Sequence, residues 1–425
     1  MDQNIIISLL SKEMEPALGV TEPSTIALAC ASAYQQVKGE LESIKIITDP
    51  GIFKNAFSCA IPGTDDMGIE MAALLGVLGG DPALKLKVLR DITESQILNA
   101  IKLKGQDLVE IQVKRDLPEL YIDASVKTNK GIGRVIIEET HTNIVRIEVN
   151  EKVVFQKEKE KEDQKASFDI TKYTVADFKN FIDNVAISDI DFVLEAIRVN
   201  KELGKGGMKG AGMKVGLGIE QLIKANKISD DLVSYAQRLT GYAVDARMGG
   251  VPQPAMSICG SGDHGIIATM PLLAVAERMN LGEEKLAKAI VLSYLITIYI
   301  KNYSGRLSAF CGCAVAAGAG ASAGIVYLLG GGLEQIENAI NNMAANITGL
   351  ICDGGNFGCS LKAINGASTA VLSALLALEG ITIPKNSGIV GETIEETMKN
   401  MGSIASPGMV KTNDTIIDIM MAKTN

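Results

Sequence analysis

The chain is 425 residues long, which predicts two or three domains rather than one. Hydrophobic residues make up 47% of the sequence and charged residues 21%, the composition of a soluble protein with large cores. The formal net charge of −9 argues against nucleic acid as a partner, because phosphate binding needs a basic face. The seven cysteines form no regular secretory framework, so they indicate the reducing cytoplasm.

Residues 1–40 predict two helices that pack on a helical domain. Residues 5–17 are amphipathic, and the N-terminus lacks the basic and long apolar regions of a secretory signal peptide. A second helix follows, with Thr21 as its expected N-cap, Pro23 in its first turn and an end near Val37. Backbone N–H groups at such a start are free to hold an anion, so Thr21 is a candidate for binding a substrate carboxylate. An ordinary capped helix is the commoner alternative.

Residues 41–156 change to a strand pattern. Apolar and polar residues alternate in six short segments, which are 43–48, 107–113, 120–126, 133–139, 143–149 and 153–155. An apolar helix is expected at 69–78, between the early and the late strands. The block therefore predicts a small α+β domain with an antiparallel sheet.

A charge run at 157–168 has no apolar face and predicts a solvated linker at a domain boundary. The remaining residues, 169–425, have helical periodicity and predict a large all-α domain. Its most apolar stretch, 289–300, is about half as long as a bilayer span. The uncharged stretch 307–333 is dominated by Gly, Ala, Ser and Cys, which insert poorly into lipid. Both are expected to be buried helices, so no membrane partner is predicted.

Two glycine-rich segments interrupt the helical part. Residues 204–212 mix lysine and glycine, but the G-x-x-x-x-G-K-[ST] order and a preceding strand are absent, so a flexible surface loop is expected. Residues 260–265 read Gly-Ser-Gly-Asp-His-Gly ahead of a helix expected at 266–279. Backbone N–H groups in such a turn form a small nest for an anion. The candidates for holding a carboxylate there are Ser261, Gly262 and Asp263.

His264 closes this glycine loop and is one of two histidines, the other being His141 in the sheet domain. A histidine at a helix start acts as a proton acceptor or a metal ligand in many sites. A hydrogen-bonded structural role is the alternative.

Four cysteines lie close together in the sequence. Cys311 and Cys313 flank one glycine at the head of a small-residue run, and Cys352 and Cys359 enclose a glycine-rich loop. Several soft ligands converging from a helix start and a loop predict an iron–sulfur or zinc site. The alternative is that they are buried fillers, because free cysteine is among the most buried residue types.

Five motifs in one order now point to a family. They are Ala17–Pro23, Ile61–Thr64, Met256–Ile266, Gly305–Cys313 and Ile351–Lys362. Together they resemble the L-cysteine desulfidase family, which is related to the iron–sulfur L-serine dehydratases, and the resemblance covers essentially the whole chain. It implies a small α+β domain followed by an all-α domain like the serine dehydratase alpha chain. It also implies cytoplasmic amino acid catabolism and, on family grounds alone, a homodimer.

The resemblance further implies a 4Fe-4S cluster held by three cysteines. The matching positions are Cys352 and Cys359, with Cys313 favoured as the third ligand and Cys311 as the alternative. Three thiolates on four irons leave one iron open as a Lewis acid, the arrangement typical of catalytic metals. The implied reaction converts L-cysteine to pyruvate, sulfide and ammonia without pyridoxal phosphate.

The sequence departs from this family at Val20, where the desulfidases have the cysteine proposed as proton acceptor. An isopropyl group takes no proton, and positioned acid–base catalysis is typically worth ~10²–10⁴-fold in rate. His264 is the best visible replacement, since Cys30 lies ten residues further along the same helix, ~15 Å away. Three alternatives stay open: an L-serine or L-threonine dehydratase, an amino acid-binding homologue without turnover, and a structural zinc site.

Overall fold

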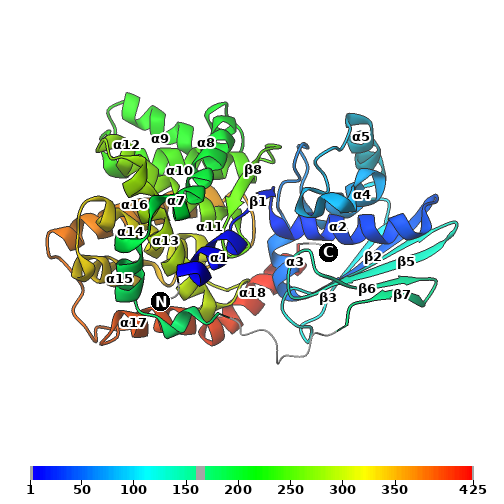
Figure 1. Ribbon diagram of the computed structural model, residues 1–425. Coiled ribbons are helices and arrows are strands. Elements are labelled where there is room, and N and C mark those ends of the chain that lie inside the picture. The colour runs from blue at the N-terminus through cyan, green and yellow to red at the C-terminus, as the bar shows by residue number, and fades with distance from the viewer. Residues whose placement is uncertain (1–2, 159–167, 424–425) are drawn as a thin grey trace.

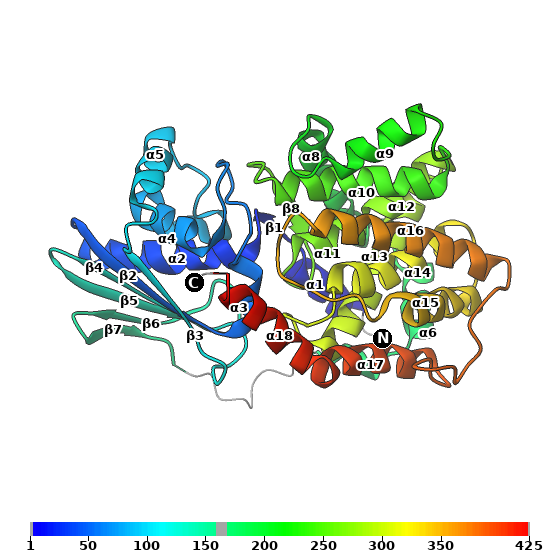
Figure 2. The same ribbon diagram turned by 180° about the vertical axis from the view of Figure 1, so that it is seen from behind.

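The computed structural model describes residues 3–158 and 168–423. It confirms the α+β class, with a small sheet and a large helical region side by side (Figure 1; Figure 2). We call residues 19–156 the sheet lobe, and residues 3–18 with 168–409 the helical lobe. Of the predicted linker, residues 159–167 lie outside the described residues, and the boundaries expected at 40, 156 and 168 stay predictions.

The sheet lobe is built on one six-stranded sheet in the order β3-β2-β4-β5-β6-β7. Neighbouring strands are antiparallel except β2 and β3, which are parallel. The six strands correspond to the six alternating segments of the sequence and are β2 (Leu41–Thr48), β3 (Val109–Val113), β4 (Ile122–Thr128), β5 (Gly131–Ile137), β6 (Ile144–Val149) and β7 (Lys152–Gln156). Alternation along β4 buries Ile122, Ala124 and Val126 under the helices of this lobe.

Four helices and a 3₁₀ turn accompany the sheet: α2 (Thr21–Val37), α3 (Pro50–Ala56), α4 (Gly68–Gly79), η1 (Pro82–Lys87) and α5 (Glu94–Leu103). The expectation that residues 1–40 pack on the helical domain is wrong for α2, which crosses the sheet and contacts α4, β4 and β5. Alanines along α2 permit this close approach. At Gly133 of β5, an added Cβ would lie 2.1 Å from the carbonyl oxygen of Ala33.

The helical lobe surrounds α13 (Glu283–Ser304), whose residues 289–300 are all buried, as the sequence predicts. Around it and outward lie η3 (Ile170–Lys172), α6 (Val175–Asn184), α7 (Ile187–Ile190), η4 (Asp191–Leu194), α8 (Glu195–Met208), α9 (Val215–Lys224), α10 (Leu232–Met248), α11 (Gly262–Ile267), α12 (Met270–Arg278), η5 (Cys313–Ala317, a π-helix), α14 (Gly318–Leu328), α15 (Leu333–Ile347), α16 (Cys359–Leu378), α17 (Ile394–Ser403) and η6 (Ile404–Gly408, a π-helix).

The chain crosses between the lobes at both ends. Helix α1 (Gln3–Glu13) is shorter than the expected 5–17 helix, because Glu15–Leu18 forms β1 and pairs antiparallel with β8 (Pro254–Ser257). At the other end, α18 (Val410–Met421) leaves the helical lobe and packs on α3, with Ile416 and Ile417 in the sheet-lobe core. Figure 2 shows α18 running from one lobe to the other. These two segments connect the lobes to each other.

Two expectations in the helical lobe are wrong. The segment 204–212 is not a loop throughout, because α8 continues to Met208. Its glycines are packing sites: an added Cβ at Gly207 would lie 2.0 Å from the carbonyl oxygen of Tyr242 in α10. The helix expected at 266–279 is two helices, α11 and α12, and the second begins with Met270 and Pro271.

Helix α16 is long and apolar enough to cross a membrane by length and composition. Half of its apolar window is buried inside the protein, against α10, α14 and α15. This is the burial pattern of a core helix in a globular protein, which passes the same test of length and hydropathy.

Candidate functional site

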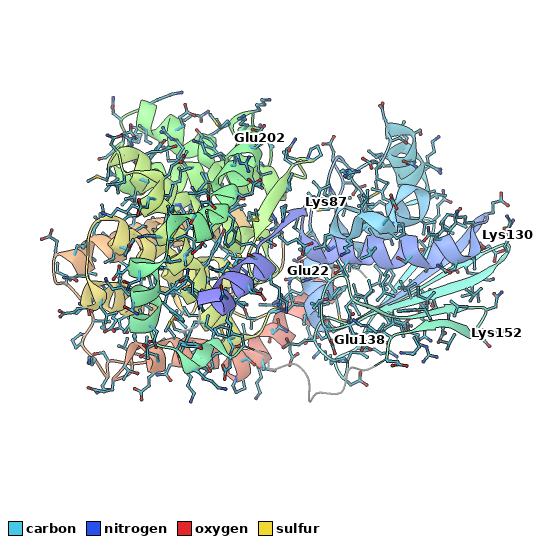
Figure 3. All side chains as sticks on the ribbon, in the orientation of Figure 1. Glu22, Lys87, Lys130, Glu138, Lys152 and Glu202 are labelled. Carbon is cyan, nitrogen blue, oxygen red and sulfur yellow. The ribbon has the colours of Figure 1, made fainter. Side chains whose placement is uncertain are left out.

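A pocket lies between the lobes, with an empty volume of about 710 Å³ that includes solvent at its mouth. All four closely spaced cysteines line it, and so do both histidines. Of the candidate residues predicted from the sequence, Gly262 alone does not line this pocket. Figure 3 labels Glu22, which stands where the two lobes meet.

Backbone contacts bring the two cysteine pairs together. Phe310 and Ile351 form an antiparallel bridge, the amide of Cys311 donates to the carbonyl of Leu350 at 2.7 Å, and the amide of Cys352 donates to Ala309 at 2.8 Å. The segment before the π-helix and the loop before α16 therefore run side by side. Sequences forty residues apart meet because their backbones pair.

The other two cysteines stand at helix starts. Cys313 is the first residue of the π-helix η5, and Cys359 is the first residue of α16. Gly366 of α16 lets these two helices approach closely, because an added Cβ there would lie 2.8 Å from Ala314 Cα. A glycine in the middle of a helix is unfavourable by itself and is retained here by packing.

The thiols differ in electrostatic environment. A hydrogen bond with Cys313 lowers the pKa of Cys311 to about 7, against the effect of its burial. That shared hydrogen bond and burial both raise the pKa of Cys313 well above its ordinary value. Burial likewise raises the pKa of Cys359. Thiolates buried this deeply need a compensating cation, which a metal centre supplies.

The donor set fits an iron–sulfur cluster in its chemistry, since soft thiols from three segments line one pocket. Among residues 3–158 and 168–423, however, no group of three or more His, Cys, Asp or Glu side chains is arranged as a metal site. The structure thus brings Cys313, Cys352 and Cys359 to one pocket without showing a coordination shell.

The glycine loop carries one partner of an ion pair. Asp263 forms a buried ion pair with Arg247, Oδ1 to Nη1 at 2.9 Å, with both side chains less than a tenth exposed. Burial alone would lower the pKa of the Arg247 guanidinium, but the charge of Asp263 outweighs it and the pKa is raised. Gly262 packs on this arginine, because an added Cβ would lie 2.6 Å from its Nε. Asp263 and Arg247 thus satisfy each other's charge, and the carboxylate-binding role of this loop stays a prediction.

His264 lies on the cysteine side of the pocket. An added Cβ at Gly312, between Cys311 and Cys313, would lie 2.4 Å from its Nε2. Burial, together with the charge of Lys301, lowers the pKa of His264 to about 3. The ring is therefore neutral at pH 7 and is a weak proton acceptor.

Lys301, which the sequence analysis missed, lies on α13 and reaches the same pocket with its side chain 6% exposed. Its Nζ donates to the carbonyl of Arg306 and to Ser308 Oγ, each at 3.1 Å. Burial lowers its pKa. Both of these hydrogen-bond acceptors are neutral oxygen atoms. A lysine within an otherwise apolar helical run was the one sequence signal for it.

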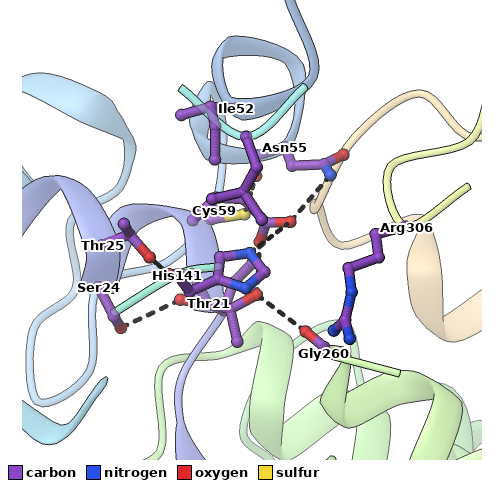
Figure 4. Close-up of polar contacts among 12 residues, drawn as sticks. Thr21, Ser24, Thr25, Ile52, Asn55, Cys59, His141, Gly260 and Arg306 are labelled. Carbon is purple, nitrogen blue, oxygen red and sulfur yellow. Dashed lines mark hydrogen bonds and ion pairs between the residues drawn. The ribbon is translucent and has the colours of Figure 1, made fainter. Parts of the chain in front are cut away.

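The sheet lobe adds a polar group that sequence analysis also missed (Figure 4). Glu22 is buried and accepts hydrogen bonds from Asn55 Nδ2 at 3.0 Å and Thr21 Oγ1 at 2.9 Å. His141, in the loop after β5, places Nε2 3.9 Å from Glu22 Oε1. Burial would raise the pKa of Glu22, but His141 and the Thr21 hydroxyl outweigh it and lower that pKa to about 2.

The start of α2 corrects one expectation. Val20, not Thr21, is the N-cap, and it makes no side-chain cap hydrogen bond. The Thr21 hydroxyl lies 2.9 Å from Glu22 Oε2 and 3.2 Å from the carbonyl oxygen of Gly260. Because a hydroxyl has one proton, it donates a hydrogen bond to one of these two acceptors at a time. Val20 itself lines the pocket and is 6% exposed.

Comparisons with known proteins agree with this architecture. The model of the family described as serine dehydratase alpha chain matches residues 84–418. A UPF0597 protein of Clostridium botulinum strain Hall is 52% identical over 428 residues, which cover 99% of both chains. UPF0597 proteins of Clostridium tetani and of Caldanaerobacter subterraneus subsp. tengcongensis are each 39% identical over at least 99% of both chains. The chain belongs to the serine dehydratase alpha chain family, among its UPF0597 members.

Proposed function

We propose that the protein is an iron–sulfur lyase that removes the β-substituent and the amino group of a small L-amino acid, with L-cysteine as the substrate. The supporting observation is the pocket itself: the four closely spaced cysteines, Cys259 and two histidines line one space between the lobes, in a chain of the serine dehydratase alpha chain family. The products from L-cysteine are pyruvate, sulfide and ammonia.

Cys313, Cys352 and Cys359 would hold the 4Fe-4S cluster, with Cys311 as the alternative to Cys313. When bound, the cluster supplies a Lewis acid that assists departure of the β-substituent. Arg247 and Lys362 also line this pocket. Both cations are already paired with carboxylates, Asp263 and Asp353 respectively.

Lys301 is the proposed anchor for the substrate carboxylate. It is buried and cationic, and both acceptors of its hydrogen bonds are neutral. A buried, unneutralised cation binds an anion more strongly than an exposed one, because water screens it less. This role replaces the one expected for Ser261, Gly262 and Asp263, while Thr21 contributes by supporting Glu22.

Side chains of the protein then carry out the proton transfers. A base takes the proton from Cα, the C–H electron pair forms a Cα=Cβ bond, and the β-substituent leaves with its own electron pair. The resulting enamine tautomerises and hydrolyses to the keto acid and ammonia. His264, neutral beside the cysteines, accepts hydrogen bonds on the leaving-group side of the pocket.

The test is a substrate panel with protein purified and assayed without oxygen. We expect sulfide and pyruvate in equal amounts from L-cysteine, at a higher rate than ammonia from L-serine or L-threonine. A higher rate with serine or threonine would make the protein a dehydratase. A protein that holds iron but turns over none of the three would refute the lyase assignment.

Val20 favours one second candidate, an amino acid-binding homologue that lacks turnover. The informative variant is Val20→Cys, which restores a thiol at the start of α2. If the variant turns over L-cysteine and the wild type does not, this second function is correct. Equal rates would show that the valine is no defect and that the proton acceptor lies elsewhere.

A further inference from the structure

We infer that His141 takes the proton from the substrate Cα and that Glu22 is the positioning residue that orients its ring. The inference rests on the proposed lyase function and names the base that Val20 cannot provide. Both residues come from the sheet lobe, whereas every candidate cluster ligand comes from the helical lobe. The base and the ligands thus face each other across the pocket.

The orientation of the imidazole ring carries this assignment. Its Nε2 edge points to Glu22, with Oε1 at 3.9 Å, and this buried nitrogen has no hydrogen-bond partner among the described residues (Figure 4). The opposite edge faces the glycine loop, since an added Cβ at Gly260 would lie 3.7 Å from Nδ1 and 3.5 Å from Cε1. Gly260 and His141 both line the pocket. A proton on Nε2, directed at the carboxylate, leaves the Nδ1 lone pair available to a substrate.

Glu22 is held firmly enough to set this orientation. Asn55 and Thr21 occupy one carboxylate oxygen each, and they come from α3 and from the residue before Glu22. With a pKa of about 2, the carboxylate stays ionised and is itself a poor proton acceptor. A carboxylate behind a histidine fixes the ring tautomer and stabilises the imidazolium that forms, as in the catalytic triads of hydrolases.

Two charged side chains lie near the His141 ring. Glu22 faces it from α2, and Arg306 faces it from the loop after α13, where an added Cβ at Gly260 would lie 3.2 Å from Nη1. Arg306 also pairs with Glu13 at 3.2 Å. The Glu22 carboxylate therefore lies where it can compensate the charge of the imidazolium when a proton arrives.

The step balances within the pocket. The proton moves from Cα to Nδ1 of His141, the C–H pair becomes the Cα=Cβ bond, and the pair of the breaking Cβ–S bond leaves with sulfide. The imidazolium then passes its proton to the enamine Cβ or to water, which restores the neutral ring.

The test uses His141→Gln and Glu22→Gln in the whole protein, with Thr142→Ala as a neighbouring control outside the pocket lining. Two rates are measured: elimination from L-cysteine, and exchange of the Cα proton of L-alanine with deuterium from the solvent. L-Alanine has no leaving group, so its exchange reports the base alone. We expect His141→Gln to lower both rates by ~10²–10⁴-fold. Glu22→Gln should lower them less and move the acidic limb of kcat/KM to lower pH, because a nearby anion favours the imidazolium.

A second readout needs no turnover. With two histidines in the chain, ¹⁵N-labelled imidazoles give two sets of signals, assigned by the His141→Gln variant. We expect His141 to carry its proton on Nε2 in the wild type and to mix tautomers in Glu22→Gln. Suppose that the wild type eliminates sulfide from L-cysteine and that His141→Gln exchanges the Cα proton of L-alanine within threefold of the wild-type rate. This result would overturn the assignment of His141 as the base and leave the proposed function intact. An iron-loaded wild type that neither eliminates nor exchanges would overturn the proposed function with it.

Discussion

The two lobes contribute opposite chemistry to one pocket. The helical lobe brings soft thiols and the Lys301 cation, on helix starts and a paired loop. The sheet lobe brings a carboxylate and an imidazole, from the start of α2 and the loop after β5. The proposed elimination needs both sets, because it requires cluster ligands and a base. The candidate site therefore exists only where the two lobes meet.

The largest expected effect tests the helical side. Protein prepared without oxygen should hold about four irons per chain. Cys352→Ser and Cys359→Ser should each lose most of that iron, because a hydroxyl replaces a soft thiolate ligand. The measurement is iron and sulfide content together with the visible spectrum.

Cys311→Ser and Cys313→Ser form the matched pair for the third ligand. We expect Cys313→Ser to lose the iron and Cys311→Ser to keep it. The reverse outcome would exchange their roles, and iron retained in all four variants would remove the cluster from the proposal.

The second prediction compares two arginine–carboxylate groups, one at the pocket and one on the sheet. Arg247→Met leaves Asp263 charged and buried, which should cost ~3–5 kcal/mol of the free energy of unfolding. Arg134→Met on β5 removes contacts to Asp123 and Glu148, but the arginine is 36% exposed, so the cost should be about 1 kcal/mol or less. Urea denaturation measures both variants. Equal costs would mean that the pocket pair is hydrated.

The third prediction tests the close contact that places Cys313. Gly366→Ala should destabilise by ~1–3 kcal/mol, since its Cβ meets the backbone of Ala314. Gly218→Ala in α9 is the control: nothing lies within 4 Å of the added methyl group, and alanine favours a helix by up to ~1 kcal/mol. Thermal unfolding should shift in opposite directions for the two variants. A stabilised Gly366→Ala variant would show that the π-helix moves freely.

The last prediction distinguishes the two lobes by the pH dependence of stability, which changes gradually over several pH units. His264 has a pKa of about 3 when folded and an ordinary value of 6.5, so the unfolded chain binds the proton first as pH falls. Its neutral form therefore contributes stability above pH 6.5 that is lost towards pH 3, by at most ~1.4 kcal/mol per pH unit. Glu22, with a pKa of about 2 against 4.5, loses its contribution only below about pH 4.5.

Stability profiles of His264→Asn and Glu22→Gln against the wild type measure these windows. His264→Asn should flatten the slope between pH 6.5 and 4.5, where Glu22→Gln should leave it unchanged. An unchanged slope in His264→Asn would mean that this histidine is not buried as a neutral ring.

Much of the fold was predictable because its signals are local. Alternation located all six strands of the sheet, and the apolar run 289–300 is the buried centre of α13. The glycine-rich segment 204–212 led to a wrong prediction, because glycine is common both in loops and at close contacts between helices. At Gly207 the local pattern predicted a loop, whereas Tyr242, far along the chain, shows that the residue is a packing site.

The candidate site was predictable on one side only. Cysteine spacing pointed to Cys352 and Cys359, and a histidine after glycines pointed to His264. Glu22 and His141 carried no such signal, since a carboxylate in a first helical turn and a histidine in a loop are common. Their 3.9 Å approach joins residues 119 positions apart on different elements.

The sequence by itself determined the elements, the fold class and the set of cysteines available to a metal, because periodicity and residue type act over short distances. Tertiary structure alone decided that α2 covers the sheet, that Asp263 pairs with Arg247, and that Glu22 and His141 line the same pocket as the cysteines. Those three facts depend on which surfaces meet when the lobes pack. No segment contains that information until its partner lies against it.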